Sequence, residues 1–389
     1  MLEREIQLPE NKDFFLLGPR QTGKTTLLHH FLKNRRFLEI NFLKTSVFRK
    51  YAESPSLLLE EVAALDAGIT HVFLDEVQRV PEMLNDVQSL IDSKVRQKFV
   101  MSGSSARKLK RQDANTLGGR AWNFTLFPLT VNEMGGNFNL KQTLSYGSLP
   151  QIFLSESTSD RIGNLEAYVD MYLEQEIKAE ALSRKIGAFA RFLKVAAQTN
   201  GELINYSSIA KDVGLNYMTV QDYFSILEDT LIGNFLLPIH HSERKRHKQS
   251  PKFYFFDTGV LRAVQGRLAI EAQPGTFEFG NCFETFIINE VQRINTYRKK
   301  RWTLGFLRTV NDVEVDLVIE SPDSSVLGVE IKSKVLPDYR DFGAGYEALK
   351  KLLPKAQFMC VCTGDSSRLV NGVRVEPYAE FLNWLRSHS

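Results

Sequence analysis

The stretch Phe14–Leu28, FFLLGPRQTGKTTLL, decides the fold of the N-terminal part of the chain. Apolar residues 14–17 predict a buried strand, residues 18–25 fit the pattern G-x-x-x-x-G-K-[ST], and a helical pattern follows. This order predicts a phosphate-binding loop, because Gly18 and Gly23 let backbone N–H groups point at phosphate oxygens. Lys24 adds a full positive charge, and the Thr25 hydroxyl can bind Mg²⁺. We therefore expect nucleotide contacts from Gly18, Pro19, Arg20, Gln21, Thr22, Gly23, Lys24, Thr25 and Thr26.

A phosphate-binding loop requires an acidic partner strand, and residues 71–76, HVFLDE, supply one. The apolar run predicts a strand buried on both faces of a parallel sheet. We expect Asp75, at the carboxyl end of this strand, to help hold Mg²⁺, and Glu76 to polarise a water molecule against the γ-phosphate. Around it, the sequence predicts a strand at 36–42 and helices at 54–67 and 81–94, the last with Pro81 at its first position.

A further strand is predicted at 98–101, and it ends in Ser102-Gly-Ser104-Ser105. Ser102 or Ser104 either senses the γ-phosphate or simply forms the turn. Arg120 can neutralise transition-state charge, in its own chain or in a neighbouring subunit of a homo-oligomer, or it is a surface charge.

Composition is that of a soluble globular protein of two or three domains, with 389 residues, 43% hydrophobic and 24% charged. A net charge of +3 excludes a global electrostatic commitment to nucleic acid or membranes. Cys282, Cys360 and Cys362 have neither disulfide-framework nor zinc spacing and indicate reduced thiols. We find no signal peptide and no apolar run long enough for a membrane helix, so we expect a cytoplasmic protein that does not contact membranes.

These motifs together resemble a known family. The loop GPRQTGKTTLL, the strand LDEVQ, the strand end SGSS, the LGGR at 117–120 and the YGSLP at 146–150 are similar to prokaryotic AAA-type predicted ATPases. The resemblance continues through MYLEQEI at 171–177, KFYFFDTG at 252–259 and the segment around Phe283–Glu284. It implies an ATPase fused to a C-terminal domain of uncharacterised function with a PD-(D/E)XK nuclease core.

The middle of the chain is predicted to be helical, with helices at 189–198, 207–213 and 217–228, the last capped by Asn216. Runs at 231–237 and 252–256 read as the strands of a wing, which makes a winged helix-turn-helix, a DNA-reading shape. However, residues 212–243 contain five acidic residues and no Lys or Arg, so the third helix lacks cations that could contact phosphates. We therefore favour a role for this helix in packing between domains over one in reading DNA. The basic loop 244–248, RKRHK, either binds phosphates or is a solvated loop.

A second constellation follows near the C-terminus. A helix at 279–290 carries Glu284 beside its apolar stripe, and strands at 313–319 and 327–333 carry Asp316, Glu330 and Lys332. Asp316 and Glu330 can converge on Mg²⁺ or Mn²⁺ while Lys332 orients or activates the attacking water. This is the PD-(D/E)XK arrangement, with Glu284 as the helix-borne carboxylate; the alternative is a retained fold whose carboxylates pair with Lys332. The basic run 298–301 either guides DNA or is a solvated helix end, and a strand at 357–363 and a helix at 377–386 close the domain.

The predicted fold class is α/β. It comprises a P-loop AAA-type ATPase domain at 1–135, a helical linker at 136–185, a winged helix-turn-helix at 186–256 and a PD-(D/E)XK nuclease-like domain at 257–389. We expect a Mg²⁺-dependent ATP-binding hydrolase that acts on DNA through 244–248 and 298–301. The alternative is an ATP-controlled protein-interaction switch whose winged-helix and nuclease-like domains are scaffolds without nuclease activity.

Overall fold

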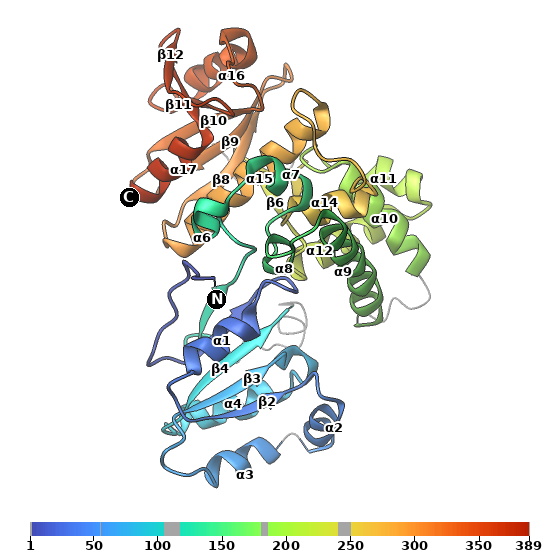
Figure 1. The fold of residues 1–389 in the computed structure, drawn as a ribbon, viewed down its shortest axis with the longest axis vertical. Coiled ribbons are helices and arrows are strands. Elements are labelled where there is room, and N and C mark those ends of the chain that lie inside the picture. Colours follow the sequence, from blue (N-terminus) through green and yellow to red (C-terminus); the bar gives the residue numbers. More distant parts are fainter. Residues whose placement is uncertain (1, 55, 105–116, 180–185, 240–249, 389) are drawn as a thin grey trace. The chain divides into compact units, whose positions relative to one another are not determined.

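The computed structural model describes residues 2–54, 56–104, 117–179, 186–239 and 250–388, with side chains of 172–186 left aside (Figure 1). The chain forms two compact units, which are described separately below. One comprises Glu5–Pro128 with Ile226–Ile232, and the other comprises Met1–Arg4, Leu129–Ser225 and Gly233–Ser389.

The N-terminal unit is a five-stranded parallel sheet with the order β2-β3-β4-β1-β5. Because β4 lies between β1 and β3, the loop after β1 and the acidic end of β3 meet at the same edge of the sheet with one strand between them. The strands are β1 (Phe14–Leu17), β2 (Phe37–Asn41), β3 (His71–Asp75), β4 (Lys98–Gly103) and β5 (Trp122–Thr125). The helices are α1 (Lys24–Leu32), α2 (Thr45–Glu53), α3 (Leu57–Ala63), the 3₁₀ turn η1 (Val77–Arg79) and α4 (Met83–Asp92).

Both faces of this sheet are covered, as the apolar strands predict. Phe73 of β3 packs in a cluster with Leu28 and Leu32 of α1. Its neighbours Val72 and Leu74 pack on the opposite face, with apolar residues of α3 and α4.

Two helix boundaries in this unit differ from the prediction. The helix expected at 54–67 runs only over Leu57–Ala63, and α2 before it was not predicted. The helix expected at 81–94 begins at Met83, so the placement of Pro81 as its first residue was wrong. Such ends depend on which residues tertiary packing holds in helical geometry, and local propensity does not show this.

The second unit contains an eight-stranded mixed sheet with the order β12-β13-β11-β10-β9-β8-β6-β7. Its strands are β6 (Gly233–Pro238), β7 (Lys252–Phe255), β8 (Thr303–Arg308), β9 (Glu314–Glu320), β10 (Val326–Lys332), β11 (Gln357–Cys362), β12 (Arg368–Val370) and β13 (Val373–Pro377). Helices α15 (Phe277–Tyr297) and α17 (Tyr378–Ser387) contribute to the core on one face, and α16 (Tyr339–Leu352) to the core on the other.

A set of helices surrounds the start of this sheet in the sequence. It consists of α6 (Val131–Met134), the turn η3 (Gly135–Asn137), α7 (Leu140–Tyr146), α8 (Pro150–Phe153), α9 (Thr158–Ala179), α10 (Ile186–Gln198), α11 (Tyr206–Val213), α12 (Tyr217–Asp229) and α14 (Thr258–Gln265). All but α14 come before β6, and the last residues of α12 belong to the N-terminal unit. The Asn216 side chain accepts a hydrogen bond from the Thr219 N–H at 2.7 Å, as expected for the start of α12. The predicted wing strands β6 and β7 pair antiparallel, and β6 also pairs in parallel with β8. The sheet is therefore continuous across residue 256, and the division there into two domains stays a prediction.

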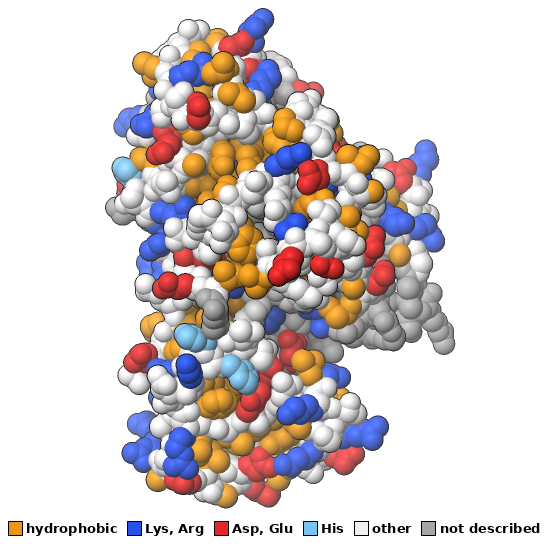
Figure 2. Space-filling view, viewed as in Figure 1, with side chains coloured by type: hydrophobic (Ala, Val, Ile, Leu, Met, Phe, Trp, Pro, Cys, Tyr) orange, Lys and Arg blue, Asp and Glu red, His pale blue; other side chains and the backbone are white. Residues whose placement is uncertain are grey.

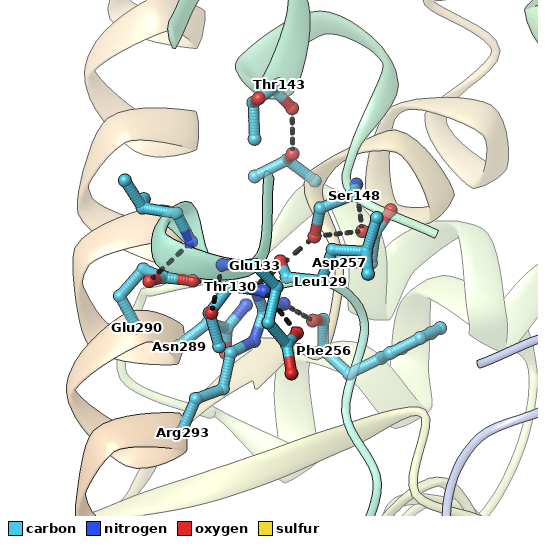
Figure 3. A network of polar contacts seen from close by, with 12 residues as sticks. Leu129, Thr130, Glu133, Thr143, Ser148, Phe256, Asp257, Asn289, Glu290 and Arg293 are labelled. Atoms are coloured by element: carbon cyan, nitrogen blue, oxygen red, sulfur yellow. Dashed lines mark hydrogen bonds and ion pairs between the residues drawn. The ribbon is translucent and has the colours of Figure 1, made fainter. Parts of the chain in front are cut away.

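A buried polar network joins the start of this unit to α15 (Figure 3). The Arg293 guanidinium donates hydrogen bonds to the backbone oxygens of Leu129 at 3.0 Å and Phe256 at 3.1 Å, and it pairs with Glu290 at 2.8 Å. Glu290, fully buried, accepts a hydrogen bond from the Val131 N–H at 3.1 Å. The residues that follow the N-terminal unit are thus held by charged side chains of α15, and a buried charge without these partners would be costly.

The same region brings together two motifs quoted for the family resemblance. The Asp257 carboxylate accepts a hydrogen bond from the Ser148 N–H at 2.7 Å and two more from N–H groups of α14. A Cβ on Gly147 would lie 1.9 Å from Asp257 Oδ1, and one on Gly259 would lie 2.0 Å from the Tyr146 oxygen. Gly259 is required because its segment touches the Tyr146 backbone. Gly147 is required because a side chain there would overlap the Asp257 carboxylate and because its φ of 78° lies in the left-handed region.

Candidate functional site

The loop between β1 and α1 has the backbone that its glycines predict. Gly23 precedes α1 with φ of 89°, in the left-handed region, and Gln21 also has a positive φ of 60°. A Cβ on Gly18 would lie 2.3 Å from the Leu126 carbonyl oxygen, so only glycine fits between the loop and the end of β5.

Lys24 lies inside this loop. Its side chain is only 6% exposed, and its Nζ donates hydrogen bonds to the Gly18 and Pro19 carbonyl oxygens, each at 2.9 Å. Thr22, also buried, donates to the Pro19 oxygen at 3.0 Å. Burial lowers the pKa of Lys24 to about 8, against the opposing attraction of Glu76. The loop therefore encloses a cation that an anion would stabilise.

Asp75 is the second component, and three side chains from three other elements donate hydrogen bonds to it. Its carboxylate accepts hydrogen bonds from the Ser102 hydroxyl at 2.5 Å, the Asn41 amide at 2.9 Å and the Thr25 hydroxyl at 3.2 Å. Burial raises the pKa of Asp75, although the Ser102 and Thr25 hydrogen bonds oppose the shift. Thr25, fifty positions away in the sequence, is thus brought next to the acidic strand end as predicted.

Glu76 follows with a positive φ of 60°, in the left-handed region, and leads from β3 into the turn η1. Its N–H donates to the Ser102 hydroxyl at 3.1 Å, and its carboxylate accepts hydrogen bonds from the Ser104 hydroxyl at 3.2 Å and from the Gln78 amide. The Gln78 amide also donates to Ser104 at 3.0 Å. Ser102 and Ser104 therefore position the two acidic side chains, whichever of their predicted roles holds.

The sequence analysis missed Asn41 and Gln78. Asn41 is the last residue of β2 and pairs with Asp75 in the strand register. In the sequence, its polar side chain at the end of a predicted strand was the only feature that could have pointed to this role. Gln78 lies within the quoted LDEVQ stretch, but nothing in that stretch showed that its side chain turns back to Glu76.

Three other residues predicted to contact nucleotide lie in different surroundings from one another. Arg20 is half-buried and its charge helps to lower the pKa of Lys24, whereas Thr26 is exposed on α1. Arg120 is exposed and pairs with Asp92 at the end of α4, through Nε at 2.6 Å and Nη2 at 3.0 Å. A role in catalysis would require this pair to break.

The C-terminal constellation also comes together. Leu317 of β9 pairs with Val329 of β10, and Asp316 comes just before Leu317 while Glu330 comes just after Val329. The Lys332 ammonium lies 2.7 Å from Glu330 and 3.7 Å from Asp316. The Asp316 carboxylate accepts a hydrogen bond from the Ile331 N–H at 2.7 Å. Burial and the nearby Asp316 raise the pKa of Glu330 to about 8.

Glu284, on α15, is held by residues that the sequence analysis did not predict. The Tyr254 hydroxyl donates to its carboxylate at 2.5 Å, and the Lys252 ammonium lies 3.6 Å away while also donating to Glu314. Burial and the Asp316 charge raise the pKa of Glu284 to about 7, against the attraction of Lys252.

In this cluster the carboxylates are paired with lysine side chains. Across the described residues, no group of three or more His, Cys, Asp or Glu side chains is arranged so that it could hold a metal ion. At the C-terminal cluster two lysines stand between the carboxylates, so the predicted ligands Glu284, Asp316 and Glu330 stay a prediction.

The two basic segments differ in what can be said of them. Residues 244–248 lie outside the described residues. In the run 298–301, Arg298, Lys299 and Arg301 are exposed, and Lys300 donates a hydrogen bond to the carbonyl oxygen of His388, 88 positions later in the sequence. No helix in the described ranges is both long enough and apolar enough to span a bilayer. All three cysteines are buried and free.

Comparison with known families places these features. Residues 10–135 match a family described as an AAA domain. The N-terminal part of the chain is therefore similar to AAA domains, which supports an AAA-type ATPase. This supports ATP binding by the loop and agrees with its parallel sheet. Residues 137–271 and 279–381 match two families described only as domains of unknown function, DUF8612 and DUF4143.

Two relatives match most of the chain, and both are described as uncharacterized proteins. The chain is 28% identical over 327 residues to the uncharacterized proteins Rv2008c of Mycobacterium tuberculosis and Mb2031c of Mycobacterium bovis, covering 83% of this chain and 70% of theirs. Among solved structures, protein VC1899 from Vibrio cholerae is matched at 12% identity over 96% of both chains, with a TM-score of 0.21.

Proposed function

We propose that this protein binds Mg–ATP at the loop 18–25 and hydrolyses it. The observation that carries the proposal is the enclosed ammonium of Lys24, hydrogen-bonded to two backbone oxygens of its own loop. A nearly buried cation that donates its hydrogen bonds to neutral carbonyls gains strongly from an anionic ligand. The glycine backbone and the start of α1 offer N–H groups to the same ligand.

The neighbouring residues fit the metal that accompanies ATP. Thr25 and Asp75 supply a hydroxyl and a carboxylate at one point, which are oxygen ligands of the kind that Mg²⁺ prefers. When bound, Mg²⁺ neutralises charge on the phosphate oxygens. Asn41 and Ser102 orient Asp75, while Ser104 and Gln78 hold Glu76. Glu76 then accepts a proton from the attacking water.

Titration calorimetry and a phosphate-release assay test this proposal. Lys24→Ala should abolish ATP binding. Glu76→Gln should keep ATP affinity within about twofold but reduce hydrolysis by about 100-fold or more, because it removes only the proton acceptor. Arg96→Gln, a change to an exposed residue that contacts the Ala67 backbone, serves as the matched control. Undiminished ATP binding by Lys24→Ala would contradict the assignment of the loop.

For the second unit we propose a nucleotide-controlled binding switch in preference to a DNA-cleaving enzyme. Two observations favour the switch. Leu129 and Val131, just after the N-terminal unit, are hydrogen-bonded to Arg293 and Glu290 of α15, so a displacement of this segment would be transmitted to that helix. In addition, α12 carries no cation, and on the face seen in Figure 2 basic and acidic side chains are interspersed.

The nuclease remains a second candidate because Asp316, Glu330 and Lys332 meet in the predicted way. Plasmid and single-stranded DNA cleavage with Mg²⁺ or Mn²⁺ separates the two candidates. The switch predicts no product, together with an ATP-dependent change in partner affinity or oligomeric state and negligible DNA binding at ~150 mM salt. Cleavage that disappears in Lys332→Ala would establish the nuclease and refute the switch.

A further inference from the structure

The C-terminal carboxylate cluster contains a cation of its own, and the residue that supplies it lies outside the predicted motif. Four carboxylates form the cluster: Glu284 on α15, Glu314 and Asp316 on β9, and Glu330 on β10. Lys252 reaches them from β7, a strand that precedes β9 by about sixty positions in the sequence.

Lys252 is placed among these carboxylates as a bound ion would be. Its side chain is 5% exposed, its Nζ donates a hydrogen bond to Glu314, and it lies 3.6 Å from Glu284 Oε1. The Tyr254 hydroxyl, from the same strand, donates to that Glu284 oxygen at 2.5 Å. One oxygen of Glu284 and one of Glu314 are therefore taken by an ammonium group and a hydroxyl. The other Glu314 oxygen lies 3.4 Å from Arg308 Nη1.

The other half of the cluster retains capacity for a ligand. Lys332 pairs with Glu330 Oε1 at 2.7 Å and with Asp316 Oδ2 at 3.7 Å. Glu330 Oε2 is buried and has no hydrogen-bond partner, although Glu330 as a whole is 7% exposed. A buried carboxylate oxygen without a partner costs free energy of folding. Glu330 Oε2 is therefore an acceptor that a bound cation could use.

We propose that the Lys252 ammonium group is the resident cation of this cluster and takes the place of a divalent metal ion. The native chain then binds no divalent metal here, since the ion would meet a positive charge in the position between Glu284 and Glu314. Removal of Lys252 creates a metal site formed by Glu284, Glu314 and Asp316. This inference does not depend on ATP hydrolysis at the N-terminal loop.

The test is to titrate the full chain with Mn²⁺ in the absence of nucleotide. Binding is measured by calorimetry and by the electron paramagnetic resonance signal of free Mn²⁺. Lys252→Met keeps most of the side-chain length but removes the charge. We expect no saturable Mn²⁺ binding by the native chain at this cluster, and an affinity gain of about tenfold or more in Lys252→Met. Mn²⁺ should also raise the unfolding temperature of Lys252→Met while leaving that of the native chain unchanged.

Two controls locate the gained site. Lys141→Met removes a lysine from a half-exposed pair with Glu271 elsewhere in this unit and should gain no Mn²⁺ binding. Asp316→Asn added to Lys252→Met should remove the gained binding. If Lys252→Met does not fold, Lys252→Gln, which keeps a hydrogen-bond donor for Glu314, is used in the same measurement.

Two results would overturn the inference. One is Mn²⁺ binding by the native chain that is lost in Asp316→Asn, because the metal and Lys252 would then share the cluster. The other is a folded Lys252→Met or Lys252→Gln protein, still able to bind ATP, whose Mn²⁺ affinity equals that of the native chain.

Discussion

The buried Lys24 predicts that ATP binding takes up a proton and weakens in alkaline solution. In the nucleotide-free protein burial lowers the pKa of Lys24 to about 8. A triphosphate beside the ammonium favours its charged form and returns the pKa toward its ordinary value of about 10.4. ATP therefore binds the protonated protein, and the deprotonated fraction must first take up a proton.

The magnitude follows from this difference in pKa. Between the two pKa values the apparent dissociation constant for ATP should rise about tenfold per pH unit, which is about 1.4 kcal/mol of binding free energy per unit. At pH 8 it should be about twofold above its neutral value, and at pH 9 about tenfold. Proton uptake should be about half a proton per ATP at pH 8 and close to one at pH 9.

Calorimetry in buffers of different ionisation enthalpy measures proton uptake and affinity together. The terminal phosphate of ATP completes its own ionisation below this range, so the alkaline change reports the protein. A flat affinity between pH 7 and pH 9.5 without proton uptake would refute the reasoning. The sign for stability is the opposite: without ATP, the unfolded chain binds more protons than the folded one between pH about 8 and about 10.4, so the free energy of unfolding should rise across this range.

Further predictions concern the supports of the two units. Arg293→Met should lower the free energy of unfolding by about 3–5 kcal/mol in urea denaturation, because it leaves the buried Glu290 without its closest charged partner; a loss below 1 kcal/mol would contradict this role. Gly259→Ala should cost about 1–3 kcal/mol or more, since its Cβ would overlap the Tyr146 oxygen. The matched change Gly163→Ala, with open space on an exposed helix, should raise stability by about 0.5–1 kcal/mol; equal effects of the two would exclude a packing explanation. Gln78→Ala should reduce ATP hydrolysis by about tenfold at unchanged ATP affinity, because Glu76 loses a positioning donor; unchanged turnover in the phosphate-release assay would show that Ser104 alone suffices.

Parts of the sites were predictable because their geometry is local or follows from parallel strands. The positive φ of Gly23 and the burial of Lys24 lie within one loop. Asp75 could be assigned to the same edge because the carboxyl ends of parallel strands lie together. Asp316, Glu330 and Lys332 lie on strands joined by a short turn, so their proximity could also be inferred.

The remaining members could not be found in this way. Asn41 reaches Asp75 only because β2 is the neighbour of β3 in a sheet whose order is 2-3-4-1-5. Gln78 reaches Glu76 only because Glu76 adopts a left-handed backbone conformation and a 3₁₀ turn follows it. The predicted wing was likewise assigned to a domain separate from the C-terminal carboxylates. In the structure β6 pairs with both β7 and β8, which brings Lys252 of β7 next to Glu284.

The amino-acid sequence by itself determined that an N-terminal loop would enclose Lys24 and that a set of acidic residues would recur near the C-terminus. Spacing, glycine content and alternation act between close neighbours and can be read without coordinates. Only the tertiary structure decided which side chains neutralise those acids, because ion pairs form across strands that are distant in the chain. Whether Glu284 faces a metal ion or Lys252 depends on strand order, and no local pattern encodes that order.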